Sequence, residues 1–155
     1  MNKQDKLFEK IHAAFDGCSE VPERVTEYPL NDPEDYDGEG ESVEQYYGGR
    51  NWKEVDFRNV GGFLISYLKV DALLYYLPAI LIAILRYEKP NTDFTDRAFS
   101  AFGDPKRFDE KIEQVRNALN FEQKLVLVEV FSEVNSWNNW YSNEIKFIRE
   151  KFGHK

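Results

Sequence analysis

Apolar residues recur at helical spacing along most of the chain. Near the start, a predicted helix over residues 4–16 has an apolar face made of Leu7, Phe8, Ile11 and Phe15. Gly17 is placed to end this helix, because glycine readily adopts the left-handed conformation that closes helices. Periodicity of this kind predicts a helix that packs one side against a core.

The most apolar stretch is the run Leu73–Leu85, which contains Pro78. Asp71 is a suitable N-cap for a helix that enters this run. Because proline has no amide hydrogen and disrupts a helix interior, we expect two consecutive helices, over 71–76 and 78–88. A helix that crosses a membrane needs about 20 apolar residues, so this shorter run predicts the centre of a buried core and no membrane association.

Three further helices are predicted in the C-terminal part. Asp104 and Pro105 suit an N-cap and a first helical position, and the helix that they begin would have an apolar face of Phe108, Ile112, Val115 and Leu119. Asn120 and Gln123 form the pattern of a capping box for the next helix. Residues 135–139 are poor helix formers and predict a break before a last helix with Trp140, Tyr141, Ile145, Ile148 and Phe152.

Residues 18–50 have a different character. They are interrupted by three prolines and four glycines, so they predict a long irregular segment with one short extended piece at Val25–Tyr28. Residues 51–152 are predicted to be a helical core. A length of 155 residues fits one domain. The predicted fold is therefore mainly α, a single-domain bundle over residues 1–155 of about five to seven helices, with a long irregular acidic segment near the N-terminus.

Charge is concentrated in that same segment. The chain has 28 acidic and 20 basic side chains and a formal net charge of −8. Between Glu20 and Glu44 there are ten acids and one base, Arg24, so this stretch carries −9 and the remainder +1. This balance argues against binding nucleic acid by phosphate neutralisation. An apolar content of 42% excludes a disordered chain, and a single cysteine excludes a disulfide-stabilised fold.

Several segments are similar to a family of small bacterial proteins known only as a domain of unknown function. The most distinctive is Asp71–Ala79, with its tyrosine-leucine-proline sequence. The other similar positions are Phe15-Asp16-Gly17, Trp52–Val55, Leu64–Leu68, Leu119–Gln123, Val126 and Val130. The resemblance implies a small acidic helical domain and no established activity, and it supplies no catalytic residues to transfer.

Residues suited to catalysis are few. His12 and His154 are the two histidines and Cys18 is the one cysteine, which is too few for a usual zinc site. The HExxH, GxSxG, P-loop and GxGxxG patterns are missing, so we predict a protein that is not an enzyme, with no catalytic residue and no cofactor. His12 and Cys18 could form a nucleophile–base pair, but a buried thiol near a surface histidine is the favoured interpretation.

The acidic segment contains an incomplete calcium-loop pattern. With Gly38 at the sixth position, Asp35, Asp37 and Glu44 fall at positions three, five and twelve, but the first position is a proline. With Gly40 at the sixth position, Tyr46 falls at the twelfth, where a glutamate is needed. We therefore predict no metal site, and calcium binding stays as an alternative.

Tyrosines alternate with these acids and suggest a protein-binding surface. Tyrosine supplies buried area at interfaces while carboxylates steer a basic partner, although the tyrosines could instead pack on the core. The predicted partner-binding residues, as a group, are Asp35, Tyr36, Asp37, Glu39, Glu41 and Tyr46. Trp137, Trp140 and Tyr141 could share one helical face, for which core packing is favoured over a ligand site.

Three functional hypotheses follow. The first is a non-enzymatic binding protein, most concretely a bacterial immunity-type protein that neutralises a basic, nuclease-like toxin. The second is a structural or regulatory helical module, and the third is a metal-binding protein or enzyme that uses the carboxylates. The charged start of the chain is unlike a secretory leader and the lone cysteine suits a reducing compartment, so we expect a cytoplasmic protein. The oligomeric state is not predicted.

Overall fold

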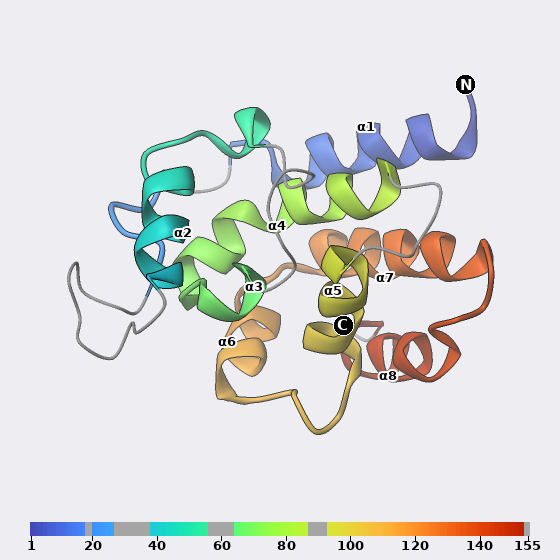
Figure 1. Cartoon of the computed structure of the whole chain (residues 1–155). Helices are drawn as coiled ribbons and strands as arrows, with labels where there is room; N and C mark the ends of the chain where they lie inside the picture. The colour runs from blue at the N-terminus through green and yellow to red at the C-terminus, as the bar shows by residue number, and fades with distance from the viewer. Residues whose placement is uncertain (18–19, 27–37, 56–63, 87–92, 154–155) are drawn as a thin grey trace.

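A computed structural model describes the fold over residues 1–17, 20–26, 38–55, 64–86 and 93–153. It is mainly helical, as predicted (Figure 1). In chain order the helices are α1 (Lys3–Phe15), α2 (Glu39–Tyr47), the 3₁₀ helix η1 (Trp52–Glu54), α3 (Leu64–Tyr67), α4 (Val70–Arg86), α5 (Asp93–Gly103), α6 (Glu110–Ala118), α7 (Phe121–Ser136) and α8 (Ser142–Phe152). In the described part of the chain, extended pairing is limited to one antiparallel bridge between Thr26 and Leu68.

Helix α4 is the centre of the core, which confirms the prediction from its composition. It packs against α1, α5, α6, α7 and η1. Most of its side chains are buried, on every side of the helix. None of the described helices is both long and apolar enough to cross a membrane.

The prediction of two helices separated at Pro78 is wrong. Helix α4 continues through Pro78, and its first turn is joined to Lys69, whose carbonyl accepts from the amide of Leu73 at 2.8 Å. Asp71 therefore lies inside the first turn instead of serving as the N-cap. The surrounding helices bury α4 all round, and this burial offsets the one hydrogen bond that proline cannot make.

The predicted end of α1 at Gly17 and the predicted capping box at the start of α7 are confirmed. Gly17 has a φ of 76°, the left-handed conformation expected after a helix. Asn120 and Gln123 form the complete capping box of α7. The side chain of Gln123 also donates to the carbonyl of Ala14 at 3.1 Å, so the start of α7 is tied to the end of α1.

Two helix starts and one whole helix differ from the predictions. Asp104 caps a turn, since its carboxylate accepts from the amide of Lys106 at 3.0 Å, and α6 begins later, after the N-cap Asp109. Helix α8 likewise begins at Ser142, after both Trp140 and Tyr141. The sequence analysis did not predict α5, whose buried face consists of Phe94, Thr95, Ala98, Phe99 and Phe102.

The prediction that residues 18–50 are irregular is wrong for α2. Gly38, with a φ of 67°, precedes this helix and Gly48 follows it, so the glycines mark its ends. Val43 and Tyr47, four residues apart, bury the inner face of the helix. The predicted extended piece is confirmed at its start, where Thr26 pairs with Leu68. The rest of that piece, residues 27 and 28, lies outside the described residues.

Candidate functional site

The six predicted partner-binding residues divide into two groups. Asp35, Tyr36 and Asp37 lie outside the described residues. The other three, Glu39, Glu41 and Tyr46, belong to α2, where the side chains of Glu41 and Tyr46 are partly exposed. The structure therefore gives the geometry of the α2 half of the predicted surface.

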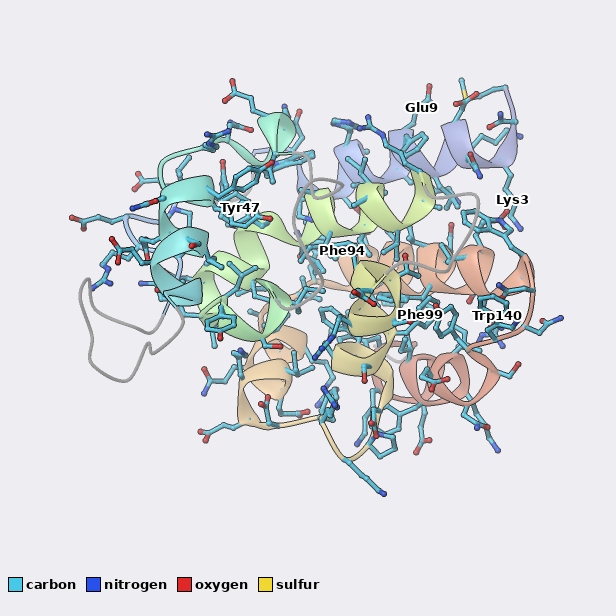
Figure 2. The ribbon with its side chains drawn as sticks, in the orientation of Figure 1. Lys3, Glu9, Tyr47, Phe94, Phe99 and Trp140 are labelled. Atoms are coloured by element: carbon cyan, nitrogen blue, oxygen red, sulfur yellow. The ribbon has the colours of Figure 1, made fainter. Side chains whose placement is uncertain are left out.

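Helix α2 is held to α4 by two tyrosines. Tyr47 is fully buried, and its ring centroid lies 5.6 Å from that of Tyr76 (Figure 2). The hydroxyl of Tyr76 donates to the carbonyl of Tyr47 at 2.7 Å and lies 2.9 Å from the carbonyl of Arg50. Burial raises the pKa of Tyr76 above its ordinary value, so the hydroxyl keeps the proton that it donates. The C-terminal end of α2 is consequently fixed to the core.

Glu44 fixes α2 to the preceding segment. Its carboxylate accepts from the amides of Val25 at 2.8 Å and Thr26 at 3.1 Å, and from the Thr26 hydroxyl at 2.9 Å. The guanidinium of Arg24 lies 3.9 Å away. Only 12% of the Glu44 side chain is exposed. This acid of the −9 stretch therefore serves the fold.

Tyr46 lies between the core and solvent. Its ring meets that of Tyr47 edge to face, with centroids 4.7 Å apart, and the guanidinium of Arg50 lies 5.1 Å from the Tyr46 centroid. Cation–π contact of this kind is weakly stabilising at exposed sites. The interpretation that the tyrosines pack on the core is confirmed for Tyr47, and Tyr46 packs against the core while staying partly exposed.

The calcium-loop pattern and the His12–Cys18 pair lie partly outside the described residues. Glu44, the twelfth position of one calcium frame, is engaged with the backbone of residues 25 and 26, while Asp35 and Asp37 lie outside the described residues. Among the described residues, no three His, Cys, Asp or Glu side chains are grouped so that they could hold a metal ion. The ring of His12 lies 5.2 Å from that of Trp52, and Cys18 is outside the described residues.

The predicted shared face of Trp137, Trp140 and Tyr141 is wrong, because these residues span the turn between α7 and α8. Tyr141 is buried and stacks on Phe99 with centroids 3.9 Å apart, so core packing is confirmed for this residue. Its hydroxyl donates to the carboxylate of Asp96. Trp140 is 61% exposed and does not share that environment.

Sequence analysis missed a basic pocket between α3, α5 and α6. It has a volume of about 250 Å³ and is lined by Ile65, Ser66, Arg97, Ala101, Lys106, Arg107, Asp109, Lys111 and Ile112. The sequence does contain four basic residues between positions 97 and 111 that point to this pocket. The acids Asp104, Asp109 and Glu110 nearly cancel their charge, so a count along the chain does not reveal them.

Comparison of the chain with protein-family models, curated proteins and solved structures finds no match. The resemblance to a bacterial domain family of unknown function therefore stays a prediction.

Proposed function

We propose that this chain is a non-enzymatic protein that binds a basic protein partner through an acidic, tyrosine-bearing face on α2 and the acids that precede it. The observation that carries the proposal is the double attachment of α2, through Tyr76 to its C-terminal end and through Glu44 to residues 25 and 26. A surface fixed before binding loses little conformational entropy when a partner docks. Glu41 and Tyr46 occupy such a surface.

The charge of the whole segment supports a basic partner. Ten acids against one base between Glu20 and Glu44 give −9, which would attract a cationic protein and raise its association rate. Of these acids, Glu44 is engaged within the fold, while Glu20 and Glu23 are exposed on the segment whose residues Val25 and Thr26 bind Glu44. The most concrete form of the proposal is a bacterial, cytoplasmic immunity-type protein that neutralises a nuclease-like toxin.

The test is capture of a partner from the native host by the full chain, followed by measurement of affinity at two salt concentrations. The variant Asp35→Asn/Asp37→Asn/Glu41→Gln removes three charges from the proposed face. A matched control, Glu9→Gln/Glu54→Gln/Glu150→Gln, removes three charges from exposed positions elsewhere. We expect a basic partner whose affinity falls about tenfold or more in the face variant and with added salt, and changes little in the control.

Two outcomes would contradict the proposal. Equal loss of affinity in both variants would show that net charge, and not this face, drives binding. Failure to capture any partner at low salt would favour the alternative of a structural or regulatory helical module.

A further inference from the structure

The basic pocket between α3, α5 and α6 reverses the charge of the molecule locally. Among the described residues, its lining contains four basic side chains and one acid, Asp109, so these residues contribute +3 on a chain whose net charge is −8. The pocket is formed by elements other than α2. A ligand bound there would therefore occupy a different place from the proposed partner face.

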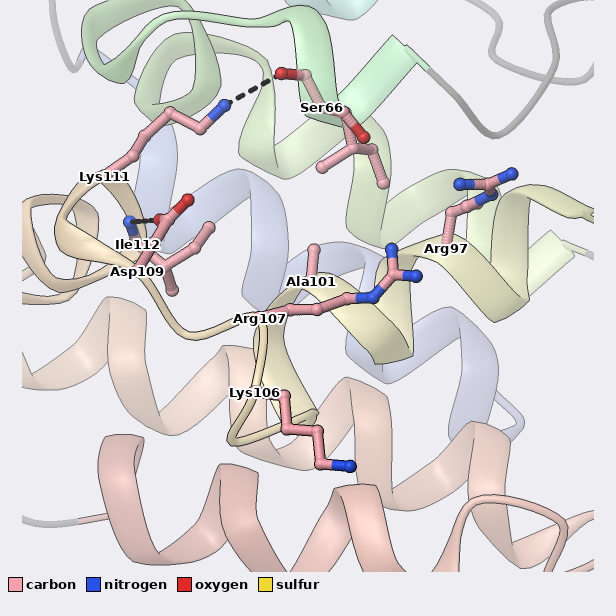
Figure 3. A pocket seen from close by; sticks show the side chains of 9 residues that line it. Ser66, Arg97, Ala101, Lys106, Arg107, Asp109, Lys111 and Ile112 are labelled. Atoms are coloured by element: carbon pink, nitrogen blue, oxygen red, sulfur yellow. Dashed lines mark hydrogen bonds between the residues drawn. The ribbon is translucent and has the colours of Figure 1, made fainter.

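Three of the four cations border the pocket from α5, the turn that follows it and α6. Figure 3 shows the Arg107 side chain extended along the pocket toward Arg97, while Lys111 reaches from α6 to α3. The ammonium of Lys111 donates to the carbonyl of Ser66 at 2.9 Å, which leaves two of its three N–H groups for other acceptors. The Lys106 ammonium points away from these three groups in the same view.

The carboxylates near the pocket are already engaged with backbone groups. Asp109 accepts from the amide of Ile112 at 3.1 Å as the N-cap of α6. Asp104 accepts from the amide of Lys106 at 3.0 Å, and its second oxygen lies 3.9 Å from Nε of Arg107, a long distance for an ion pair. Among the described residues, no carboxylate forms an ion pair with Arg97 or Lys111. The described cations of the pocket thus outnumber the nearby carboxylates, and mutual repulsion disfavours this arrangement while a bound anion would stabilise it.

We propose that this pocket binds a small phosphate-bearing molecule, with the phosphate held by Arg97, Arg107 and Lys111. A phosphate group carries about −1.5 to −2 charges and three acceptor oxygens, so it can satisfy several cations at once, whereas one carboxylate carries a single charge. The guanidinium fork of arginine matches phosphate geometry. Ile65, Ala101 and Ile112 supply apolar contact for an organic part of the ligand.

The size of the pocket limits the class of ligand. A volume of about 250 Å³ is below the roughly 300–1,000 Å³ of sites for drug-sized molecules. The expected ligand is therefore a compact organic phosphate.

The test uses the full chain and two inorganic probes, phosphate and pyrophosphate, followed by amide chemical shifts in NMR. Sodium chloride at matched ionic strength and sodium acetate are the reference anions. We expect saturable shifts confined to residues around Arg97 and 106–112, with pyrophosphate binding more tightly than phosphate and acetate the weakest. Shifts spread over the whole surface, or the same shifts with chloride, would overturn the proposal. Equal binding of acetate would also overturn it, because multiple charge would then not matter.

Variants locate the site. Arg97→Ala/Arg107→Ala should weaken pyrophosphate binding about tenfold or more, since each arginine provides charge-assisted hydrogen bonds. The control Lys6→Ala/Lys146→Ala removes the same charge from exposed positions on α1 and α8 and should leave affinity within about twofold. If the alanine variant loses its helical circular dichroism, Arg97→Gln/Arg107→Gln keeps the aliphatic stems and serves instead. Unchanged affinity in a folded arginine variant would refute the assignment.

Discussion

At the scale of single residues, the hydroxyl of Tyr76 links α4 to the last residue of α2 and to Arg50 after it. It donates to the carbonyl of Tyr47 at 2.7 Å from a fully buried position. Burial, followed by the nearby Tyr75 and Glu44, raises the pKa of this hydroxyl above its ordinary value of 10.0. Because the folded chain holds this proton more tightly than the unfolded chain, the stabilisation is complete below about pH 10 and is lost as pH rises through the folded pKa.

The variant Tyr76→Phe tests this role. It leaves the carbonyl of Tyr47 without the hydroxyl donor, which should lower the free energy of unfolding by about 1–3 kcal/mol at pH 8. The difference in the free energy of unfolding between the two proteins should narrow above pH 10. There, unfolding of the natural chain releases the proton of this hydroxyl, which increasingly favours its unfolded state, whereas the Tyr76→Phe chain has no such proton. Urea unfolding at pH 8 and pH 11 measures both effects. A difference that widens with pH would contradict the assignment.

The acids of α2 have different roles, and a pair of substitutions separates them. Glu44→Ala removes an acceptor for two amides and one hydroxyl and should cost about 1.5–3 kcal/mol in the free energy of unfolding. Glu41→Ala, one turn earlier, removes a carboxylate that accepts a hydrogen bond from Gln45 of the same helix and should change that free energy by about 0.5 kcal/mol or less. Thermal and urea unfolding measure this, and equal effects would contradict a structural role for Glu44 alone. The proposed partner face predicts the opposite ranking for affinity.

At the scale of helices, the sequence alone predicts a helix end correctly where the side chain that caps it binds backbone groups only a few residues away. The capping box of Asn120 and Gln123 and the terminal Gly17 satisfy backbone groups within a few residues, so the sequence alone predicts them. Asp104 and Asp109 are both acceptable caps, and the choice between them depends on where α6 packs. Pro78 led to the wrong prediction of two helices because burial of α4 by the surrounding helices outweighs the local cost of proline, and the local sequence does not show that burial.

The contact between α5 and α8 depends on Gly103. A Cβ atom at this position would lie 2.6 Å from Cβ of Glu144 and 2.9 Å from its Cα and carbonyl oxygen. Because backbone atoms must move to admit it, Gly103→Ala should lower the free energy of unfolding by about 1–3 kcal/mol. Ser100→Ala, one turn earlier in α5, should change it by about 0.5 kcal/mol or less. Thermal unfolding of both variants provides the comparison, and equal melting temperatures would show that the two helices separate easily.

At the scale of the whole molecule, charge follows the fold rather than the order of residues. The −9 segment was visible in the sequence because its acids lie in one stretch of the chain between Glu20 and Glu44, but the basic pocket combines residues of α3, α5 and α6. In a count of charge along the chain, Arg97, Arg107 and Lys111 are cancelled by neighbouring acids. In the fold, two of those acids, Asp104 and Asp109, accept hydrogen bonds from backbone amides as caps. Sites assembled from distant elements are therefore invisible to composition, whereas contiguous charged segments are not.

The prediction of one domain over residues 1–155 has a direct test in Trp52. This residue is 5% exposed, lies beside His12 of α1 and donates its amide to the Tyr75 hydroxyl of α4 at 3.3 Å, so it reports on the attachment of the N-terminal part to the core. The variant Trp137→Phe/Trp140→Phe leaves Trp52 as the only one of three tryptophans. We expect its fluorescence and the far-ultraviolet circular dichroism to give the same urea midpoint. The reason is that α4 contacts α1 and η1 as well as α5, α6 and α7, so these elements should unfold together. An earlier fluorescence transition would show that the part bearing α2 and η1 unfolds separately, and the partner face would then belong to a weakly attached unit.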